Sequence, residues 1–336
     1  MVKEVSKTIR NCYYKCLTYE KLYDAYMRAS SFKRNKRNVI RFSIDLESNL
    51  YNLYNDLYNN CYCSSKYREF IIYEPKERVI KALPFKDRVV HQWYIEEFIK
   101  PYVVPRFISD SYACIIGRGT HKAVLKLNKY MKIMNKRYGC YYIIKFDIKK
   151  YFFSIDKNIL YNIMCKYISD KYLLNLTYNI IFDNDFNGIP IGNYTSQYFA
   201  NIYLNELDYY IKFDLGIEFY VRYMDDFVVL VKSKDEAKRV YSLVDNFIRN
   251  NLNLVLNSKS RYYPSYLGCD FCGYIVYNDY RLLRKRSIKG MRRKIRLYEK
   301  GIMSYDEVFL SFVSWSGHAK YSASYVLVKE FFEMIE

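Results

Sequence analysis

Aspartates follow or interrupt two of the most apolar segments of the chain, and this placement constrains the fold more than any other feature. The run 141–148 is apolar apart from Lys145 and Asp147, which predicts a buried strand. Asp225 and Asp226 lie between two β-rich runs, which predicts a hairpin with acids at its tip. Because strands of one sheet can place distant residues at one edge, we expect the three acids to lie side by side.

Neighbouring buried carboxylates repel one another and lose hydration, so a cation is needed to neutralise them. Oxygen ligands near phosphate groups favour Mg²⁺, and two such ions can activate a 3′-hydroxyl and stabilise a leaving pyrophosphate. An Asp-Asp pair in a hairpin can also be ordinary turn chemistry. Asp147 and the basic flanking segments favour the metal site over the turn.

The composition points to a polyanionic partner. The chain has 54 Lys and Arg against 35 Asp and Glu, a net charge of +19, and its 51% of hydrophobic residues exclude general disorder. Its 41 tyrosines exceed what a core needs, so some are expected on the surface, where they can stack on bases or sugars. The charged N-terminus and the lack of a membrane-length apolar run predict a cytoplasmic protein with no membrane partner.

The nine cysteines are scattered, and only Cys269 and Cys272 form a C-x-x-C motif. With three histidines and no second pair at ligand spacing, the sequence does not predict a zinc site.

Hydrophobic periodicity predicts a largely helical chain around these strands. A helix is expected to end before Pro101, and a hairpin is expected around 70–80. The segment 31–41 is strongly basic, and a solvated loop and a phosphate contact are equally good interpretations. The other helices are expected at 1–70, 121–137, 157–169, 194–212 and 235–251, with a basic helical segment from 281 to 300.

Six segments, in order, carry a resemblance to reverse transcriptases. The hairpin Tyr223-Met224-Asp225-Asp226 resembles their catalytic hairpin, and 146–156 resembles their first palm motif. The remaining matches are the fingers strands at 78–90, the glycine loop at 188–197, the lysine motif at 254–260 and the primer grip at 266–273.

The resemblance implies an α+β fold: a right-hand polymerase with fingers, a split βαβ palm and a short helical thumb. It places the N-terminal helices and fingers at 1–140, the palm at 141–275 with a fingers-side insertion and template loop at 170–195, and the basic thumb at 276–336.

The glycine loop 191–197 and the segment 111–121 are most similar to reverse transcriptases of diversity-generating retroelements, which make errors opposite adenine. That resemblance implies an RNA template, a DNA or RNA primer, dNTPs and a small basic accessory variability protein. A bacterial or phage-infected cell would be the setting. Retron and group II intron enzymes fit this loop less well. An antiphage-defence reverse transcriptase making templated or self-primed DNA remains an alternative, as does a non-catalytic RNA-binding scaffold.

The resemblance also assigns the catalytic roles. Asp147 and Asp225 would be direct ligands of two Mg²⁺ ions, for which Mn²⁺ could substitute, with Asp226 assisting and the backbone carbonyl of Ile148 as a further ligand. Lys259 is a candidate general acid toward pyrophosphate, and a plain surface lysine is the alternative.

Further residues are expected to bind the nucleotide. Phe152 would be an aromatic steric gate against the 2′-hydroxyl, or else a core phenylalanine. Ile191 stands where a Gln could hydrogen-bond near the nascent pair, so its apolar side chain predicts low fidelity. Related enzymes usually carry an Arg where this chain has Ile115, so Arg118 or Arg78 would replace that phosphate contact. The other candidates are Lys76, Arg88, Gly192 and Gln197.

A last group is expected to contact the template–primer duplex in a salt-sensitive, sequence-independent way. Its members are Tyr223, Met224, Leu267, Gly268, Arg284, Lys285, Arg292 and Arg293.

Overall fold

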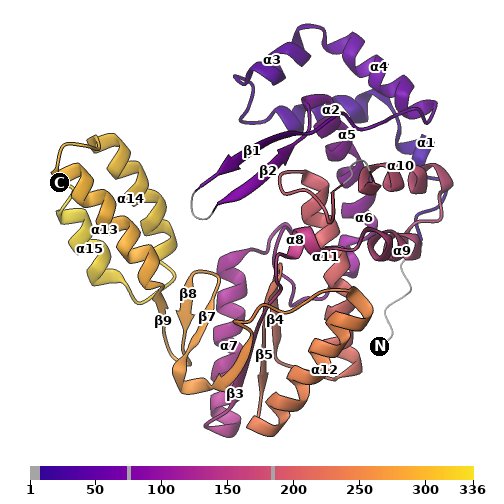
Figure 1. The fold of residues 1–336 in the computed structure, drawn as a ribbon. Helices are drawn as coiled ribbons and strands as arrows, with labels where there is room; N and C mark the ends of the chain where they lie inside the picture. Colours follow the sequence, from indigo (N-terminus) through magenta and orange to yellow (C-terminus); the bar gives the residue numbers. More distant parts are fainter. Residues whose placement is uncertain (1–7, 74–76, 183–185) are drawn as a thin grey trace. The chain divides into compact units, whose positions relative to one another are not determined.

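The computed structural model describes residues 8–73, 77–182 and 186–336, and the chain divides into two compact units (Figure 1). The first unit comprises residues 1–108, 149–209 and 247–255, and the second comprises residues 109–148, 210–246 and 256–336. The boundaries of fingers, palm and thumb that the sequence suggests remain predictions.

The first unit is mainly helical and contains one antiparallel hairpin. The hairpin pairs β1 (Arg68–Ile72) with β2 (Arg78–Ala82), as predicted, and its tip lies outside the described residues. Its helices are α1 (Tyr13–Cys16), α2 (Tyr19–Ser30), α3 (Arg37–Ile44), α4 (Leu46–Tyr58), α5 (Phe85–Tyr94), the π-helix η1 (Ile95–Ile99), α6 (Lys100–Tyr102), η2 (Val104–Arg106), α8 (Tyr151–Ser154), α9 (Lys157–Tyr167), α10 (Lys171–Phe182) and α11 (Tyr194–Tyr209).

Two helix boundaries differ from the prediction. The N-terminal helices end at Tyr58 rather than near residue 70, because Asn60 adopts a left-handed φ of 56° that stops a helix. The predicted end before Pro101 is also wrong, since α6 runs from Lys100 to Tyr102. A proline fits there because it lies in the first turn of a new helical segment, where its missing N–H is not needed.

The second unit is built on a four-stranded antiparallel sheet in the order β4-β5-β3-β6. Its strands are β3 (Tyr142–Asp147), β4 (Tyr220–Tyr223), β5 (Asp226–Val231) and β6 (Arg261–Pro264). With helices before β4 and before β6, the chain follows the β-α-β-β-α-β order of a split βαβ motif. The predicted α+β class and palm topology are therefore confirmed.

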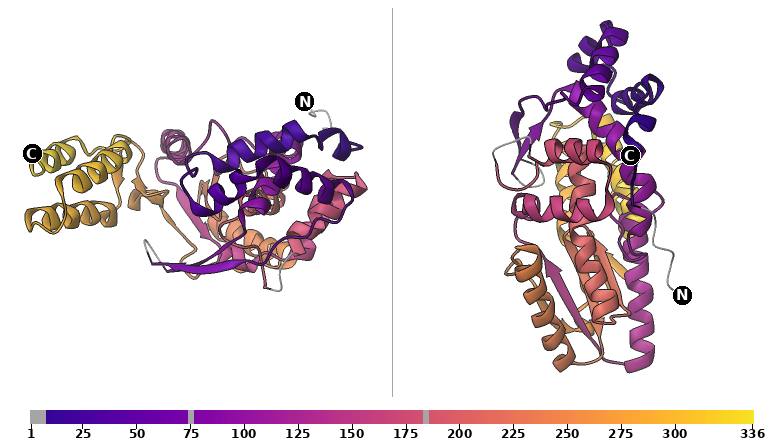
Figure 2. Two further views of the ribbon diagram at one scale, coloured as in Figure 1. Left: turned by 90° about the horizontal axis from the view of Figure 1, so that it is seen from above. Right: turned by 90° about the vertical axis from the view of Figure 1, so that its right-hand side faces the viewer.

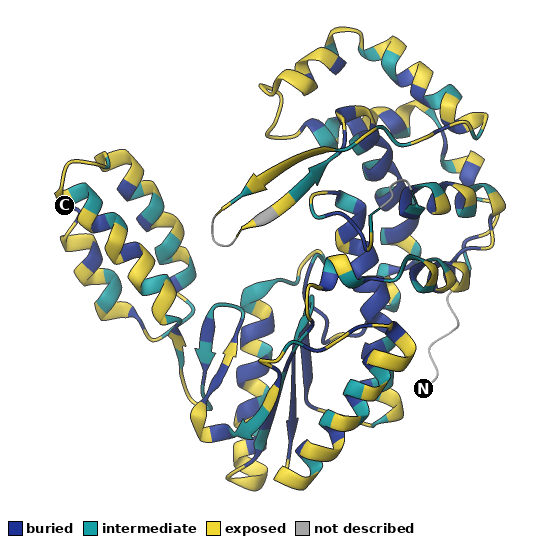
Figure 3. Cartoon of the chain, viewed as in Figure 1, coloured by how far each residue is buried: buried dark blue, intermediate teal, exposed yellow. Residues whose placement is uncertain are grey.

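The central strand β5 is buried along most of its length, and β3 alternates between buried and partly buried residues, as Figure 3 shows. Their apolar side chains pack with α7 (Thr120–Tyr138) and with a second sheet of β7 (Cys269–Phe271), β8 (Tyr274–Val276) and β9 (Arg281–Leu283). The other helices that precede the C-terminal helices are η3 (Tyr210–Asp214), α12 (Lys234–Leu252), whose residues from Phe247 on belong to the first unit, and η4 (Ser265–Leu267).

Three C-terminal helices, α13 (Lys285–Glu299), α14 (Tyr305–Ala319) and α15 (Tyr325–Glu333), lie side by side in Figures 1 and 2. They share a small apolar core that includes Ile295, Phe312 and Phe331. α14 begins with a capping box in which Ser304 and Glu307 satisfy each other's backbone amides. This bundle is the helical segment predicted as the thumb.

Candidate active site

The register of the palm sheet brings carboxylates from two strands to one edge. β3 ends at Asp147 and β5 begins at Asp226, and these two residues are direct partners in the antiparallel pair. Asp225 directly precedes Asp226 and belongs, with Met224, to the two-residue loop between β4 and β5. All three acids are only partly buried. The structure thus places Asp147 opposite Asp226 and Asp225 next to it in the chain, as the sequence predicted.

The loop that carries Asp225 is held in an unusual conformation. Met224 has a left-handed φ of 55°, a region that favours glycine in tight hairpins. The side chain of Arg222, which is completely buried, donates a hydrogen bond of 3.1 Å from Nη1 to the carbonyl oxygen of Met224. A buried guanidinium therefore helps to fix the tip.

The main chain of Asp147 is clamped by the predicted lysine motif. Its N–H donates to Oγ of Ser260 at 3.0 Å, and that hydroxyl donates to the Asp147 carbonyl at 3.1 Å. The backbone N–H of Asn257 also donates to this carbonyl at 2.7 Å. Lys259, in the same loop, has an exposed side chain, and its backbone N–H donates to Oδ1 of Asn257. The loop positions the strand end, and the role of Lys259 as an acid remains a prediction.

Lys145 supplies a positive charge beneath these carboxylates. It lies two residues before Asp147, and its Nζ forms an ion pair with Oδ1 of Asp226. The ammonium group also lies 4.9 Å from the centre of the Phe271 ring, a cation–π contact. Burial lowers the pKa of Lys145, while the neighbouring Cys269, Cys272 and Asp270 favour its charged form.

The C-x-x-C thiols lie beside this lysine. None of the nine cysteines forms a disulfide with another cysteine of the described residues, and Cys269 is completely buried. Burial raises the pKa of Cys272 to about 12, so its thiol stays protonated at neutral pH.

Magnesium fits the donor set at the sheet edge, although the described residues contain no group of three or more His, Cys, Asp or Glu side chains arranged to hold a metal ion. Mg²⁺ commonly takes one or two carboxylates and fills its remaining positions with water and substrate phosphates. The partly exposed carboxylates of Asp147 and Asp225 are donors of this kind. The Asp226 carboxylate forms an ion pair with Lys145, and the assisting role predicted for Asp226 remains a prediction.

Within the first unit, the glycine loop joins two of the predicted nucleotide contacts. The N–H of Ile189 donates to the carbonyl of Phe152 at 2.8 Å, and a Cβ on Gly188 would lie 2.3 Å from the same oxygen. At the other end of the loop, the carbonyl of Ile191 accepts from the N–H of Lys81 in β2 at 3.1 Å.

Gly192 is required by this packing, because a Cβ there would lie 2.9 Å from the Lys81 carbonyl. Gln197 is exposed on α11 and makes contacts within the fold. The loop thus connects the Phe152 turn with the fingers hairpin, and the nucleotide-binding roles of these residues remain predictions.

The predicted phosphate-binding cations are dispersed. Lys76 lies outside the described residues, and Arg78 belongs to β2. Arg88 lies on α5, where its Nε donates to the Leu83 carbonyl at 3.0 Å. Arg118 belongs to the second unit and donates from Nη1 to the carbonyl of Ser111 at 2.6 Å. Their predicted triphosphate contact remains untested.

The predicted primer contacts divide into exposed and engaged residues. Leu267 is exposed, and Gly268 has a φ of 72° with the Tyr277 ring against the place of a Cβ. Arg284 forms an ion pair with Asp270. The exposed cations of α13 include Lys285, Arg292 and Arg293, and the Arg292 guanidinium lies 5.6 Å from the centre of the Phe331 ring.

Three supporting residues were not predicted as part of the site: Lys145, Arg222 and Ser260. Lys145 had a visible signal, since it is the one charge that interrupts the run before Asp147. Arg222 similarly interrupts an apolar strand beside the hairpin tip. No comparable signal marks Ser260, one of several polar residues in its loop.

The sheet topology and the acids at its edge define a polymerase-type palm. Residues 73–276 match the family model described as reverse transcriptase (RNA-dependent DNA polymerase). The chain therefore belongs to the reverse transcriptase family, which confirms the right-hand polymerase fold class.

Among individual proteins, a COX1/OXI3 intron 2 protein of Saccharomyces cerevisiae is 23% identical over 235 residues, which is 48% of this chain and 27% of that protein. The chain thus spans about a quarter of this relative's length.

Telomerase structures show a weaker likeness. One from Candida tropicalis has a TM-score of 0.49 at 14% identity, covering 65% of this chain and 55% of that one. Another, from Candida albicans with a TWJ fragment of telomeric RNA, has a TM-score of 0.49 at 12% identity, covering 81% and 59%.

Proposed function

We propose that this protein is an RNA-directed DNA polymerase. The observation that carries the proposal is the strand register that sets Asp147 opposite Asp226, with Asp225 in the adjoining hairpin loop. Membership of the reverse transcriptase family supports RNA as template and DNA as product.

The protein's own residues have distinct roles in this proposal. Asp147 and Asp225 would hold Mg²⁺, with the Ile148 carbonyl as a further ligand, while Lys145 holds Asp226 in place. When bound, Mg²⁺ would favour deprotonation of the primer 3′-hydroxyl and stabilise charge on the departing pyrophosphate. The exposed Lys259 donates a proton to that pyrophosphate.

Binding and selection of the nucleic acid fall to other parts of the chain. Phe152 closes the space that a 2′-hydroxyl would need and so favours dNTPs. The exposed cations of α13 contact phosphates of the template–primer duplex. The described part of the chain contains no helix long and apolar enough to cross a membrane.

Primer extension on a defined RNA, with Mg²⁺ present, tests the proposal. We expect Asp225→Ala to lower extension by more than about 100-fold, because even partners that only support metal ligands contribute about 10–100-fold. Asp235→Asn, which changes an exposed acid on α12, is the matched control and should retain activity. No activity in the wild type would favour the non-catalytic RNA-binding scaffold, and equal activity in the wild type and Asp225→Ala would refute the catalytic role of Asp225.

We propose further that synthesis is error-prone and serves a diversity-generating retroelement, with a small basic accessory protein as partner. The feature that favours this is the apolar side chain of Ile191 in the glycine loop. Its backbone is anchored to Lys81, so the side chain can be changed without releasing the loop. Products that do not depend on template sequence would instead favour the antiphage-defence alternative.

Sequencing of cDNA made by Ile191→Gln tests this finer proposal. We expect misincorporation opposite adenine to fall several-fold, because a Gln side chain can hydrogen-bond near the nascent pair. Ile116→Gln is the control, since Ile116 is 83% exposed and lies in the second unit. An unchanged error spectrum in Ile191→Gln would count against a fidelity role for this residue.

A further inference from the structure

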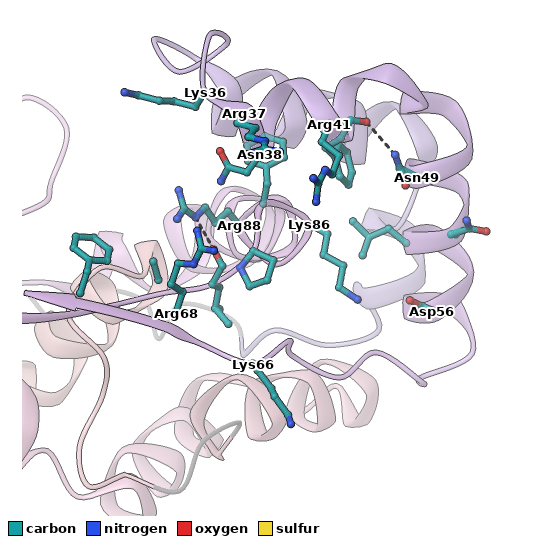
Figure 4. Close-up of a pocket in the computed structure, with 18 residues that line it drawn as sticks. Lys36, Arg37, Asn38, Arg41, Asn49, Asp56, Lys66, Arg68, Lys86 and Arg88 are labelled. Atoms are coloured by element: carbon teal, nitrogen blue, oxygen red, sulfur yellow. Dashed lines mark hydrogen bonds between the residues drawn. The ribbon is translucent and has the colours of Figure 1, made fainter.

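A pocket of about 1170 Å³ opens in the first unit between α3, α4, β1 and α5 (Figure 4). Pockets for small molecules usually measure about 300–1,000 Å³, so this one has room for more than a single nucleotide. Buried apolar side chains, including Phe42, Leu83 and Phe85, form part of its lining. The pocket is therefore a built depression rather than a gap between mobile side chains.

One wall of the pocket comes from the basic segment that begins α3. Lys36 occupies the N-cap position without a capping hydrogen bond from its side chain, and Arg37 and Arg41 follow one turn apart along the helix. All three side chains are exposed. For this segment the sequence left a solvated loop and a phosphate contact as equal interpretations, and its place in a pocket wall favours the phosphate contact.

The facing wall brings four more cations from distant parts of the chain. Lys66 precedes β1 by two residues, Arg68 begins β1, and Lys86 and Arg88 come from the first turn of α5. Figure 4 shows Arg68 and Arg88 close together, and the bond from Arg88 Nε to the Leu83 carbonyl fixes its guanidinium. Three elements thus direct positive charge to one depression.

The charge of this pocket is not balanced by the protein. Asp56 is the single acid among the lining residues, and none of the seven cations forms a salt bridge with a carboxylate in residues 8–73, 77–182 or 186–336. Like charges gathered in this way repel one another, which an anionic ligand relieves. The amides of Asn38, Asn49 and Asn52 add uncharged groups that can bond to sugars or bases.

We propose that this pocket binds consecutive phosphates of a single RNA strand. This inference rests on the proposed function, which requires an RNA substrate, and it assigns an RNA-binding site to α3, β1 and α5 that does not depend on the carboxylates of the second unit. A free nucleoside triphosphate offers the same phosphate chemistry. The pocket's size, its seven dispersed cations and its amides fit a strand with 2′-hydroxyls better than one nucleotide.

The test measures RNA binding in the absence of synthesis. In an Asp225→Ala background, binding of a fluorescein-labelled single-stranded RNA is followed by anisotropy over a range of salt concentrations, without primer or dNTPs. The pocket variant is R37Q/R41Q/R68Q, and R37K/R41K/R68K keeps the charge. The control is K129Q/K132Q/K136Q, which removes the same charge from exposed positions on α7 in the second unit.

We expect the pocket variant to weaken binding about tenfold or more and to lower the slope of log K against log salt by about 2, since each lost single-strand phosphate contact lowers it by about 0.7. The lysine variant should retain most of the slope, and the control should change the slope by less than about 0.7, the value for one phosphate contact. Equal effects in pocket variant and control would overturn the proposal. Displacement of the RNA from the wild type by dGTP, absent from the pocket variant, would overturn it in favour of a nucleotide site.

Because binding is read without catalysis, this result is independent of the proposed polymerase activity. Loss of extension in Asp225→Ala with intact pocket-dependent RNA binding supports both proposals. Absence of extension in the wild type with intact pocket-dependent binding would refute the polymerase and support the RNA pocket.

Discussion

Removal of the positive charge of Lys145 should destabilise the palm, and the structure allows the size of the effect to be worked out. The paired Nζ of Lys145 and Oδ1 of Asp226 are buried, but the Lys145 side chain as a whole is 16% exposed and that of Asp226 is 27% exposed, so the two residues are not fully withdrawn from water. Loss of one partner costs about 3–5 kcal/mol for a fully buried pair, and exposed pairs are worth about 0–1 kcal/mol. We therefore expect Lys145→Met, which keeps most of the apolar stem, to lower the free energy of unfolding by about 2 kcal/mol.

The assay is urea denaturation in EDTA, combined with hydrogen exchange of the peptide that spans β3. Lys145→Arg keeps the charge and is the matched control, with an expected loss of less than about 1 kcal/mol. A double-mutant cycle with Asp226→Asn should give a coupling of about 2 kcal/mol, because the two groups contact directly. Lys145→Met within 0.5 kcal/mol of the wild type, or additive single mutants, would refute the assigned ion pair.

Two further predictions concern the first unit and its control positions. Gly188→Ala should lower the free energy of unfolding by more than about 3 kcal/mol, because its Cβ would lie 2.3 Å from a backbone oxygen. Gly117 has nearly the same backbone conformation, with a φ of 75°, but lies in open space, so Gly117→Ala should cost only about 1 kcal/mol. Equal melting temperatures for the two variants would contradict this prediction. His91 is fully buried, and burial lowers its pKa to about 3, so the unfolded chain binds more protons between about pH 6.5 and 3 and stability falls as the pH falls through that range. His91→Asn, which keeps an amide near Thr195, should flatten this dependence in urea midpoints measured at neutral and acid pH, and an unchanged slope would show that another group is responsible.

Local sequence patterns predicted the palm well. The apolar runs of the sequence predicted the positions of β3 and of the β4–β5 hairpin. The aspartates at the ends of these strands indicated which edge of the sheet carries the site. These features are encoded in short stretches of chain, so they can be read without tertiary information. The same reasoning misplaced the helix end at Pro101, because a proline is tolerated in a first helical turn that only the fold creates.

Residues whose role depends on distant partners could not be assigned in advance. Lys145 was visible as a break in its strand, but its partner Asp226 lies on another strand of the sheet. Arg88 was predicted to contact the nucleotide triphosphate, which remains untested, and the sequence did not show that it lines a pocket with Arg41 and Arg68 from two other elements. Such a pocket has no signature in any single segment, since each wall alone is an ordinary exposed basic stretch.

At Met224, the residue that best suits the left-handed backbone differs from the residue that supplies a side chain beside the catalytic hairpin. For the backbone alone, glycine would be the easiest residue to accommodate there, and mutational selection for folding should enrich it. A methionine instead keeps a long, polarisable side chain at the tip, next to Asp225. Selection for folding would then favour glycine at position 224, and selection for DNA synthesis would favour a side chain that makes the contacts of the methionine thioether. A library of substitutions at this position, sorted separately for protein abundance and for DNA synthesis, would distinguish the two preferences.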